Sequence, residues 1–234
     1  MTLMRQFVFV LFATVIGTGS LLAQKEDPKP LDPTRWENDM KKFEAQDEAS
    51  PPPKGALLFV GSSSIRLWEL KNNFPSEATI NRGFGGSTIA DSVHYFDLLV
   101  ARHQPKAILM YAGDNDVAHG LTPAEVAADF EKFAGLVSEK LPGTPVIYIA
   151  IKPSRKRWEM WPTMKDANDR IAAWCAKHDH FYFADIGAAM LADAEAGQPP
   201  AESWFRSDGL HLSPEGYAGW TKVIRPIIDE ALKK

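Results

Sequence analysis

The sequence is poor in cysteine, in excess positive charge and in long apolar runs. Cys175 is the only cysteine in 234 residues, so no disulfide can form within the chain, and its apolar surroundings predict a buried, inert thiol. The formal net charge is −4, whereas nucleic acids and anionic membranes select proteins with a basic excess. A disulfide-stapled fold is therefore excluded, and we expect no nucleic-acid partner.

Two catalytic signatures are absent as well. The sequence contains neither the Gly-x-Ser-x-Gly elbow of α/β-hydrolases nor the His-Glu-x-x-His motif of zinc enzymes. Five histidines fall outside the motifs described below and show no metal-ligand spacing with carboxylates, namely His94, His103, His119, His178 and His180. We therefore expect neither a metal nor another cofactor.

Residues 1–23 are typical of an export signal, with Arg5 before an apolar segment over 7–16 and small residues over 17–23. The apolar segment is short for a membrane span. We predict cleavage after Ala23, no stable membrane insertion afterwards, and a periplasmic or extracellular protein. The alternative is an uncleaved anchor. Nothing in the sequence indicates a particular oligomeric state.

Residues 24–54 are charged and rich in proline. Asp32 followed by Pro33 is a favourable helix start, and apolar residues then recur at helical spacing, at Trp36, Met40 and Phe43. We predict a helix over 33–48 that docks on the domain; the alternative is a disordered tether.

Residues 55–234 alternate apolar strands with amphipathic helices, as expected of one domain. The predicted strands are 56–61, 79–84, 107–113, 145–151 and 181–186. The predicted helices are 64–70, 88–102, 123–140, 163–178 and 214–232. This pattern predicts an α/β fold, a three-layer α/β/α sandwich around a five-stranded parallel sheet in the flavodoxin-like order.

The first predicted strand stops abruptly at Gly61, and three serines follow, Ser62, Ser63 and Ser64. Open α/β sheets keep their sites at the carboxyl ends of the strands. A serine at the start of the next helix lies near the positive end of the helix dipole, which suits a nucleophile whose attack creates an oxyanion. The alternative is that these serines only cap a helix.

Three further strand-end loops carry polar residues. Closely spaced glycines, Gly83, Gly85 and Gly86, follow the second strand and allow backbone amides to approach a ligand. After the third strand, the Asn115 amide is placed to donate to developing negative charge, although asparagine is also common in turns. Before the last helix, Asp208 and His211 are spaced so that the acid orients the imidazole as a general base; the alternative is a structural histidine.

Together, and in this order, the four blocks resemble the SGNH subgroup of the GDSL esterase/lipase family. The matching residues are Gly61-Ser62-Ser63 for Gly-Asp-Ser, Gly86 for the oxyanion glycine, 113–116 for Gly-x-Asn-Asp and 208–211 for Asp-x-x-His. The resemblance covers residues 56–232. It implies that Ser63 is the nucleophile and that His211 and Asp208 complete the triad.

The resemblance also implies an oxyanion hole formed by the amides of Ser63 and Gly86 and by the Asn115 side chain. The sequence departs from the family at Ser62, which replaces the aspartate of the motif. This departure leaves Ser62 and Ser64 as rivals, although the register from Gly61 favours Ser63.

The segment 152–162 is basic and aromatic and is expected to border the site. Its Trp158 and Trp161 are predicted to stack on sugars or to hold an acyl chain; the alternative is a lid packed by its own tryptophans. Other candidate substrate contacts are Arg66, Arg82 and Phe205. The absence of a long apolar lid argues against triglyceride lipase activity, so we expect short acyl esters, with O-acetylated carbohydrate ahead of lysophospholipid.

The sequence thus predicts an exported serine ester hydrolase that acts on small-molecule or carbohydrate esters through an acyl-enzyme. An acyltransferase or a lysophospholipase-type acylhydrolase on the same scaffold is an alternative. A catalytically silent carbohydrate-binding module would not need all four motifs together. A nucleotide binder would need a phosphate loop with a lysine, which the serine run lacks.

Overall fold

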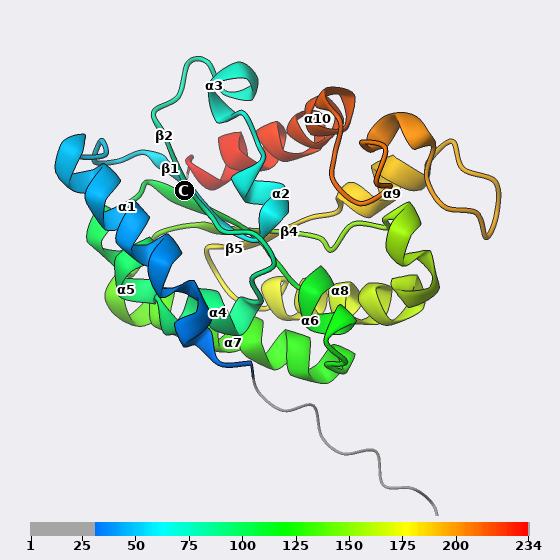
Figure 1. Cartoon of the computed structure of the whole chain (residues 1–234), viewed down its shortest axis with the longest axis horizontal. Coiled ribbons are helices and arrows are strands. Elements are labelled where there is room, and N and C mark those ends of the chain that lie inside the picture. The colour runs from blue at the N-terminus through cyan, green and yellow to red at the C-terminus, as the bar shows by residue number, and fades with distance from the viewer. Residues whose placement is uncertain (1–30, 234) are drawn as a thin grey trace, which may run out of the picture.

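The computed structural model describes residues 31–233, and the predicted export signal over 1–23 lies outside these residues. Its centre is a parallel five-stranded sheet (Figure 1) in the order β2-β1-β3-β4-β5. The strands are β1 (Leu57–Gly61), β2 (Thr79–Gly83), β3 (Ala107–Tyr111), β4 (Val146–Ile149) and β5 (Phe181–Ala184). The predicted α/β fold with flavodoxin-like order is confirmed.

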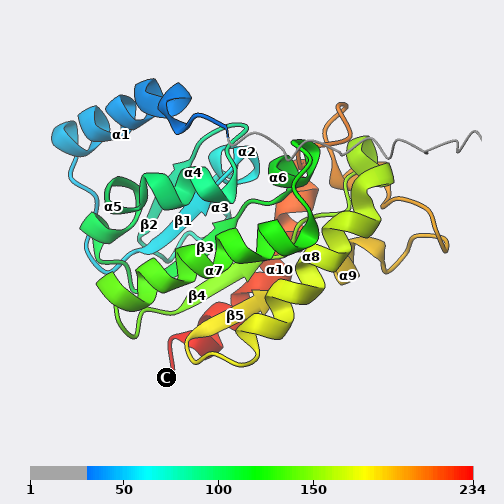
Figure 2. The ribbon, with the colours of Figure 1, turned by 90° about the horizontal axis from the view of Figure 1, so that it is seen from below.

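Helices cover both faces of the sheet. The α-helices are α1 (Glu37–Ala49), α2 (Ser63–Arg66), α3 (Leu70–Asn73), α4 (Ile89–His94), α5 (Phe96–Leu99), α6 (Asp114–Ala118), α7 (Pro123–Lys140), α8 (Trp161–Cys175), α9 (Ile186–Leu191) and α10 (Pro214–Ala231). The 3-10 helices are η1 (Pro33–Trp36), η2 (Ala101–His103), η3 (Arg155–Met160) and η4 (Glu202–Trp204). Figures 1 and 2 show α4, α7 and α8 on one face and α10 on the other.

Side-chain alternation in the strands divides the core in two. Leu58 and Val60 of β1 pack with α1, α4, α5, α7 and α8, whereas Leu57 and Phe59 pack with α2, α3, α9 and α10. Every residue of β1 is buried, because neighbouring strands and helices on both faces cover it. The carboxyl end of β1 is therefore held inside the sheet, between β2 and β3.

The first helix after β1 is shorter than the sequence predicts. In place of a helix over 64–70, α2 ends at Arg66, and α3 begins at Leu70. The Asn81 side chain donates to the carbonyl oxygens of Ile65, at 2.8 Å, and of Trp68, at 3.4 Å. The Asn81 side chain, from β2, thus binds carbonyl oxygens that would accept backbone hydrogen bonds in a longer helix.

The N-terminal segment packs on the domain through η1 and α1. Met40 is buried, and the Trp36 ring meets the Phe84 ring edge-to-face with centroids 5.5 Å apart. Arg35 Nη2 lies 2.6 Å from Asp91 Oδ2. Among residues 31–233, no helix is long and apolar enough to cross a membrane.

Candidate active site

The turn after β1 places its three serines in different environments. Gly61 ends the strand with φ of 132°, and a Cβ there would lie 1.9 Å from the Tyr111 carbonyl oxygen, so only glycine fits. Ser62 and Ser64 are fully buried, whereas Ser63 is partly exposed at the start of α2. Of the three hydroxyls, the one on Ser63 is therefore accessible to a substrate.

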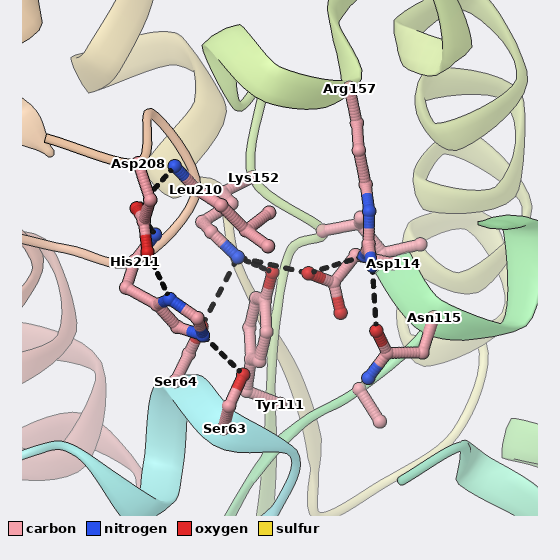
Figure 3. A network of polar contacts seen from close by, with 12 residues as sticks. Ser63, Ser64, Tyr111, Asp114, Asn115, Lys152, Arg157, Asp208, Leu210 and His211 are labelled. Atoms are coloured by element: carbon pink, nitrogen blue, oxygen red, sulfur yellow. Dashed lines mark hydrogen bonds and ion pairs between the residues drawn. The ribbon is translucent and has the colours of Figure 1, made fainter. Parts of the chain in front are cut away.

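Ser63 lies beside a histidine that is distant in sequence. Ser63 Oγ is 3.1 Å from His211 Nε2, and His211 Nδ1 is 2.6 Å from Asp208 Oδ2 (Figure 3). The carboxylate favours the tautomer with the proton on Nδ1, which leaves Nε2 free to accept the serine proton. The structure thus brings together the three side chains of the predicted triad.

A tight loop holds the acid and the imidazole. Asp208 Oδ1 accepts hydrogen bonds from the amides of Leu210 and His211, each at 2.9 Å, and Gly209, between Asp208 and Leu210, has φ of 65°. Burial alone would raise the pKa of Asp208, but the bonds from the His211 ring and from these two amides lower it to about 2. The carboxylate is therefore ionised at any pH at which a neutral imidazole is present.

The loops that carry the two other predicted oxyanion donors are hydrogen-bonded to each other. Asn115 Nδ2 donates to the Ser87 carbonyl at 2.9 Å, next to Gly86, which is exposed with φ of 83°. Asn115 Oδ1 accepts from Arg157 Nη2 at 3.0 Å. An amide nitrogen carries two hydrogens, so the second remains available beyond the bond to Ser87.

A buried charged cluster lies directly behind these residues. Lys152 Nζ is 3.1 Å from Ser64 Oγ, 2.8 Å from Tyr111 Oη and 3.0 Å from Asp114 Oδ2 (Figure 3). Arg157 Nη1 is 3.2 Å from the same carboxylate oxygen. Burial alone would raise the pKa of Asp114, but the two cations hold it below its usual value.

Known proteins share both the sequence pattern and the fold. A model of the GDSL-like lipase/acylhydrolase family matches residues 66–218, which include Asn115, Asp208 and His211 and begin just after Ser63. The chain belongs to the GDSL-like lipase/acylhydrolase family. It is therefore an enzyme of the ester-hydrolase class. No curated protein matches the sequence significantly.

Solved structures support the fold of this GDSL-like enzyme. A GDSL-like lipase from Bacteroides thetaiotaomicron is 21% identical, with a TM-score of 0.70, over 82% of this chain and 98% of that one. A carbohydrate esterase family 3 protein from Talaromyces cellulolyticus is 17% identical, with a TM-score of 0.58, over 76% and 97%. An acetyl esterase mutant with an acetate ion is 17% identical, with a TM-score of 0.59, over 76% and 97%.

One predicted substrate contact of the GDSL-like enzyme is wrong. Arg82 is buried, and its guanidinium forms an ion pair with Asp47 of α1 and donates to His103 Nε2 at 3.2 Å. Burial lowers the pKa of His103 to about 4, with the Arg82 charge adding to the effect, so the imidazole is neutral and accepts this bond. Arg82 therefore links β2 to α1 through an ion pair and is not available to a substrate.

The other candidate contacts differ in exposure. Arg66 is exposed, and its Nε would lie 3.0 Å from a Cβ on Gly85, so the guanidinium adjoins the glycine loop. The rings of Trp158 and Trp161 stack at 6.3 Å with an interplanar angle of 12°, and Trp161 also packs against the core. Phe205 is buried but lines a hollow of about 260 Å³ beside the Asp208 loop.

Sequence reasoning did not single out Lys152, Asp114 or Arg157 as part of the site. The available signal was a lysine placed directly after the apolar run 145–151, at the carboxyl end of a buried strand.

Within the described residues, no group of three or more histidine, cysteine or acidic side chains is arranged to hold a metal ion.

Proposed function

We propose that this GDSL-like enzyme is an exported serine esterase that removes short acyl groups through an acyl-enzyme. The observation that carries the proposal is the hydrogen-bonded series from Ser63 Oγ through His211 to Asp208, at 3.1 Å and 2.6 Å. A hydroxyl, an imidazole and a carboxylate in this order form an activated nucleophile.

The proposed reaction begins when Ser63 Oγ attacks the ester carbonyl and His211 Nε2 takes its proton. The carbonyl oxygen becomes negatively charged, and the amides of Ser63 and Gly86 with Asn115 Nδ2 stabilise it. The ionised Asp208 stabilises the imidazolium. His211 then protonates the leaving alcohol as its bond to the acyl carbon breaks. A water molecule, deprotonated by the same imidazole, attacks the acyl carbon; the bond to Ser63 Oγ breaks, His211 returns the proton to Oγ, and the acid leaves.

The proposed substrates are short acyl esters, with acetylated carbohydrates first. Two structures with the same fold are described as an acetyl esterase and a carbohydrate esterase. The stacked pair Trp158 and Trp161 supplies aromatic surface on the segment that also carries Arg157. Arg66 adds an exposed charge beside the glycine loop, for which the described part of the chain shows no acidic partner.

The test compares serine variants on p-nitrophenyl acetate and on an acetylated glycan. Ser63→Ala removes the covalent route, so kcat should fall by about 10⁴- to 10⁶-fold. Ser62→Ala is the matched control, because Ser62 is buried and no hydrogen bond links its hydroxyl to His211. Its kcat should stay within about threefold of the wild type. Activity that survives Ser63→Ala but disappears in Ser62→Ala would assign the nucleophile to Ser62.

A further inference from the structure

The Asn115 amide is held between two partners that recognise opposite ends of it. Arg157 Nη2 is only a donor, so it selects Oδ1, at 3.0 Å. The Ser87 carbonyl is only an acceptor, so it selects Nδ2, at 2.9 Å. Both contacts therefore favour the same orientation of the amide, although oxygen and nitrogen are nearly the same size.

This orientation matters because an oxyanion accepts hydrogen bonds only from Nδ2. If the amide turned over, Oδ1 would face the developing negative charge and repel it. A cation on Oδ1 also draws electron density through the amide, which makes the remaining Nδ2 hydrogen a stronger donor. Arg157 thus has both a geometric and an electrostatic effect on the predicted donor.

Arg157 is in turn fixed by the buried cluster. Its side chain is 18% exposed, and its Nη1 lies 3.2 Å from Asp114 Oδ2, which also binds Lys152 Nζ at 3.0 Å. With one carboxylate between two cations, the cluster carries a net positive charge when all three groups are ionised. Arg157 Nη2 reaches Asn115 Oδ1 at 3.0 Å, and positive charge behind an oxyanion hole favours the transition state.

We propose that Arg157 is a positioning residue of the oxyanion hole, which acts through Asn115 and is itself held by Asp114. The inference rests on the proposed function, because it assumes that Asn115 Nδ2 faces the oxyanion. Arg157 does not touch the reacting atoms. Its contribution should therefore exist only while Asn115 is present.

The experiment is a double-mutant cycle on p-nitrophenyl acetate, a small neutral ester that needs no cationic subsite. Removing one oxyanion donor costs about 10²- to 10³-fold in kcat, so Arg157→Met, which leaves the donor present but unfixed, should cost about 10- to 100-fold with KM nearly unchanged. In the Asn115→Ala background, Arg157→Met should change kcat by less than about threefold. Arg157→Lys, which keeps the charge, should recover part of the loss.

Arg155→Met is the matched control on the same 3-10 helix. The Arg155 guanidinium binds the Pro200 carbonyl at 2.9 Å and Glu202 at 3.3 Å and forms no hydrogen bond to Asn115, so Arg155→Met should leave kcat within about threefold of the wild type. Thermal melts establish which variants are folded. If Arg157→Met does not fold, the same cycle is run with Arg157→Lys.

Two outcomes would overturn the inference. Equal losses from the Arg157 variant in the presence and absence of Asn115 would show that Arg157 acts independently of the amide. A rise in KM with kcat unchanged would make Arg157 a substrate-binding residue. If Ser63→Ala is inactive and the cycle is additive, only the Arg157 inference fails; if Ser63→Ala is active, the proposed function fails first.

Discussion

Lys152 allows the energetics of the buried cluster to be tested directly. Its side chain is 1% exposed, and Asp114, its partner, is 5% exposed. Lys152→Met keeps the length of the side chain but removes the charge and three hydrogen bonds, to Ser64, Tyr111 and Asp114. After the change, the Asp114 carboxylate stays buried with Arg157 as its remaining cation.

The size of the effect follows from this uncompensated charge. Breaking a buried ion pair from one side typically costs about 3–5 kcal/mol, and the lower end applies because Arg157 still faces Asp114. For a domain of this size, a loss of about 3 kcal/mol lowers the melting temperature by roughly 6–12 °C. Replacing both partners by apolar residues should cost less than breaking the pair, so Lys152→Met with Asp114→Leu should regain about 2 kcal/mol relative to Lys152→Met alone.

Urea unfolding followed by tryptophan fluorescence measures these differences through the transition midpoint and slope. Lys165→Met is the control, because Lys165 is 59% exposed and its bond to Asp169, at 2.7 Å, is a surface pair worth less than about 1 kcal/mol. A cost below about 1 kcal/mol for Lys152→Met, or losses that simply add in the double variant, would refute this account of the cluster.

Three other predictions concern pH, substrate and thiol chemistry. The pKa of His103 is about 4 in the folded chain against an ordinary value of 6.5, so between these pH values the unfolded chain binds a proton that the folded chain does not. The free energy of unfolding should therefore fall by up to about 3 kcal/mol as pH drops from 6.5 to 4. In urea unfolding, the His103→Gln variant should lack this pH dependence. If the Trp158 ring stacks on sugars, Trp158→Ala should raise KM several-fold for a polymeric acetylated glycan but not for p-nitrophenyl acetate, and equal kinetic losses on both substrates would contradict this role. Trp161→Ala removes a core contact and should lower the free energy of unfolding by about 3 kcal/mol. Burial raises the pKa of Cys175 to about 12, so the thiol should react with Ellman's reagent only in urea, and rapid labelling of the native protein would disprove its burial.

Much of the fold could be predicted because the decisive signals are local. The strand over 57–61 is an unbroken apolar run, and the helix α7 begins at a capping box, in which Thr122 accepts from the Glu125 amide and Glu125 accepts from the Thr122 amide. Such features depend on neighbours within a few residues. The predicted helix over 123–140 accordingly has the observed bounds.

The residues of the predicted triad are a different case, because their types and order are visible in the sequence but their contact is not. Ser63 and His211 are 148 residues apart, and only the parallel sheet places the carboxyl end of β1 beside the loop before α10. Their meeting could be anticipated because strands of one parallel sheet end at the same edge. Among the three serines, the register from Gly61 already favours Ser63, and the tertiary structure adds that only Ser63 is partly exposed.

The sequence by itself determined the strands, the main helices and the four motifs, because periodicity, capping and turn chemistry act over short distances. The order of the strands is a matter of long-range pairing, which the tertiary structure settles. Only the tertiary structure decided what the isolated charges do. Arg82 looks like a free cation in the sequence but pairs with Asp47 of α1, and Lys152 and Arg157 enclose Asp114 behind the site. A buried charge needs a partner, and the identity of that partner depends on packing between segments that no local pattern relates.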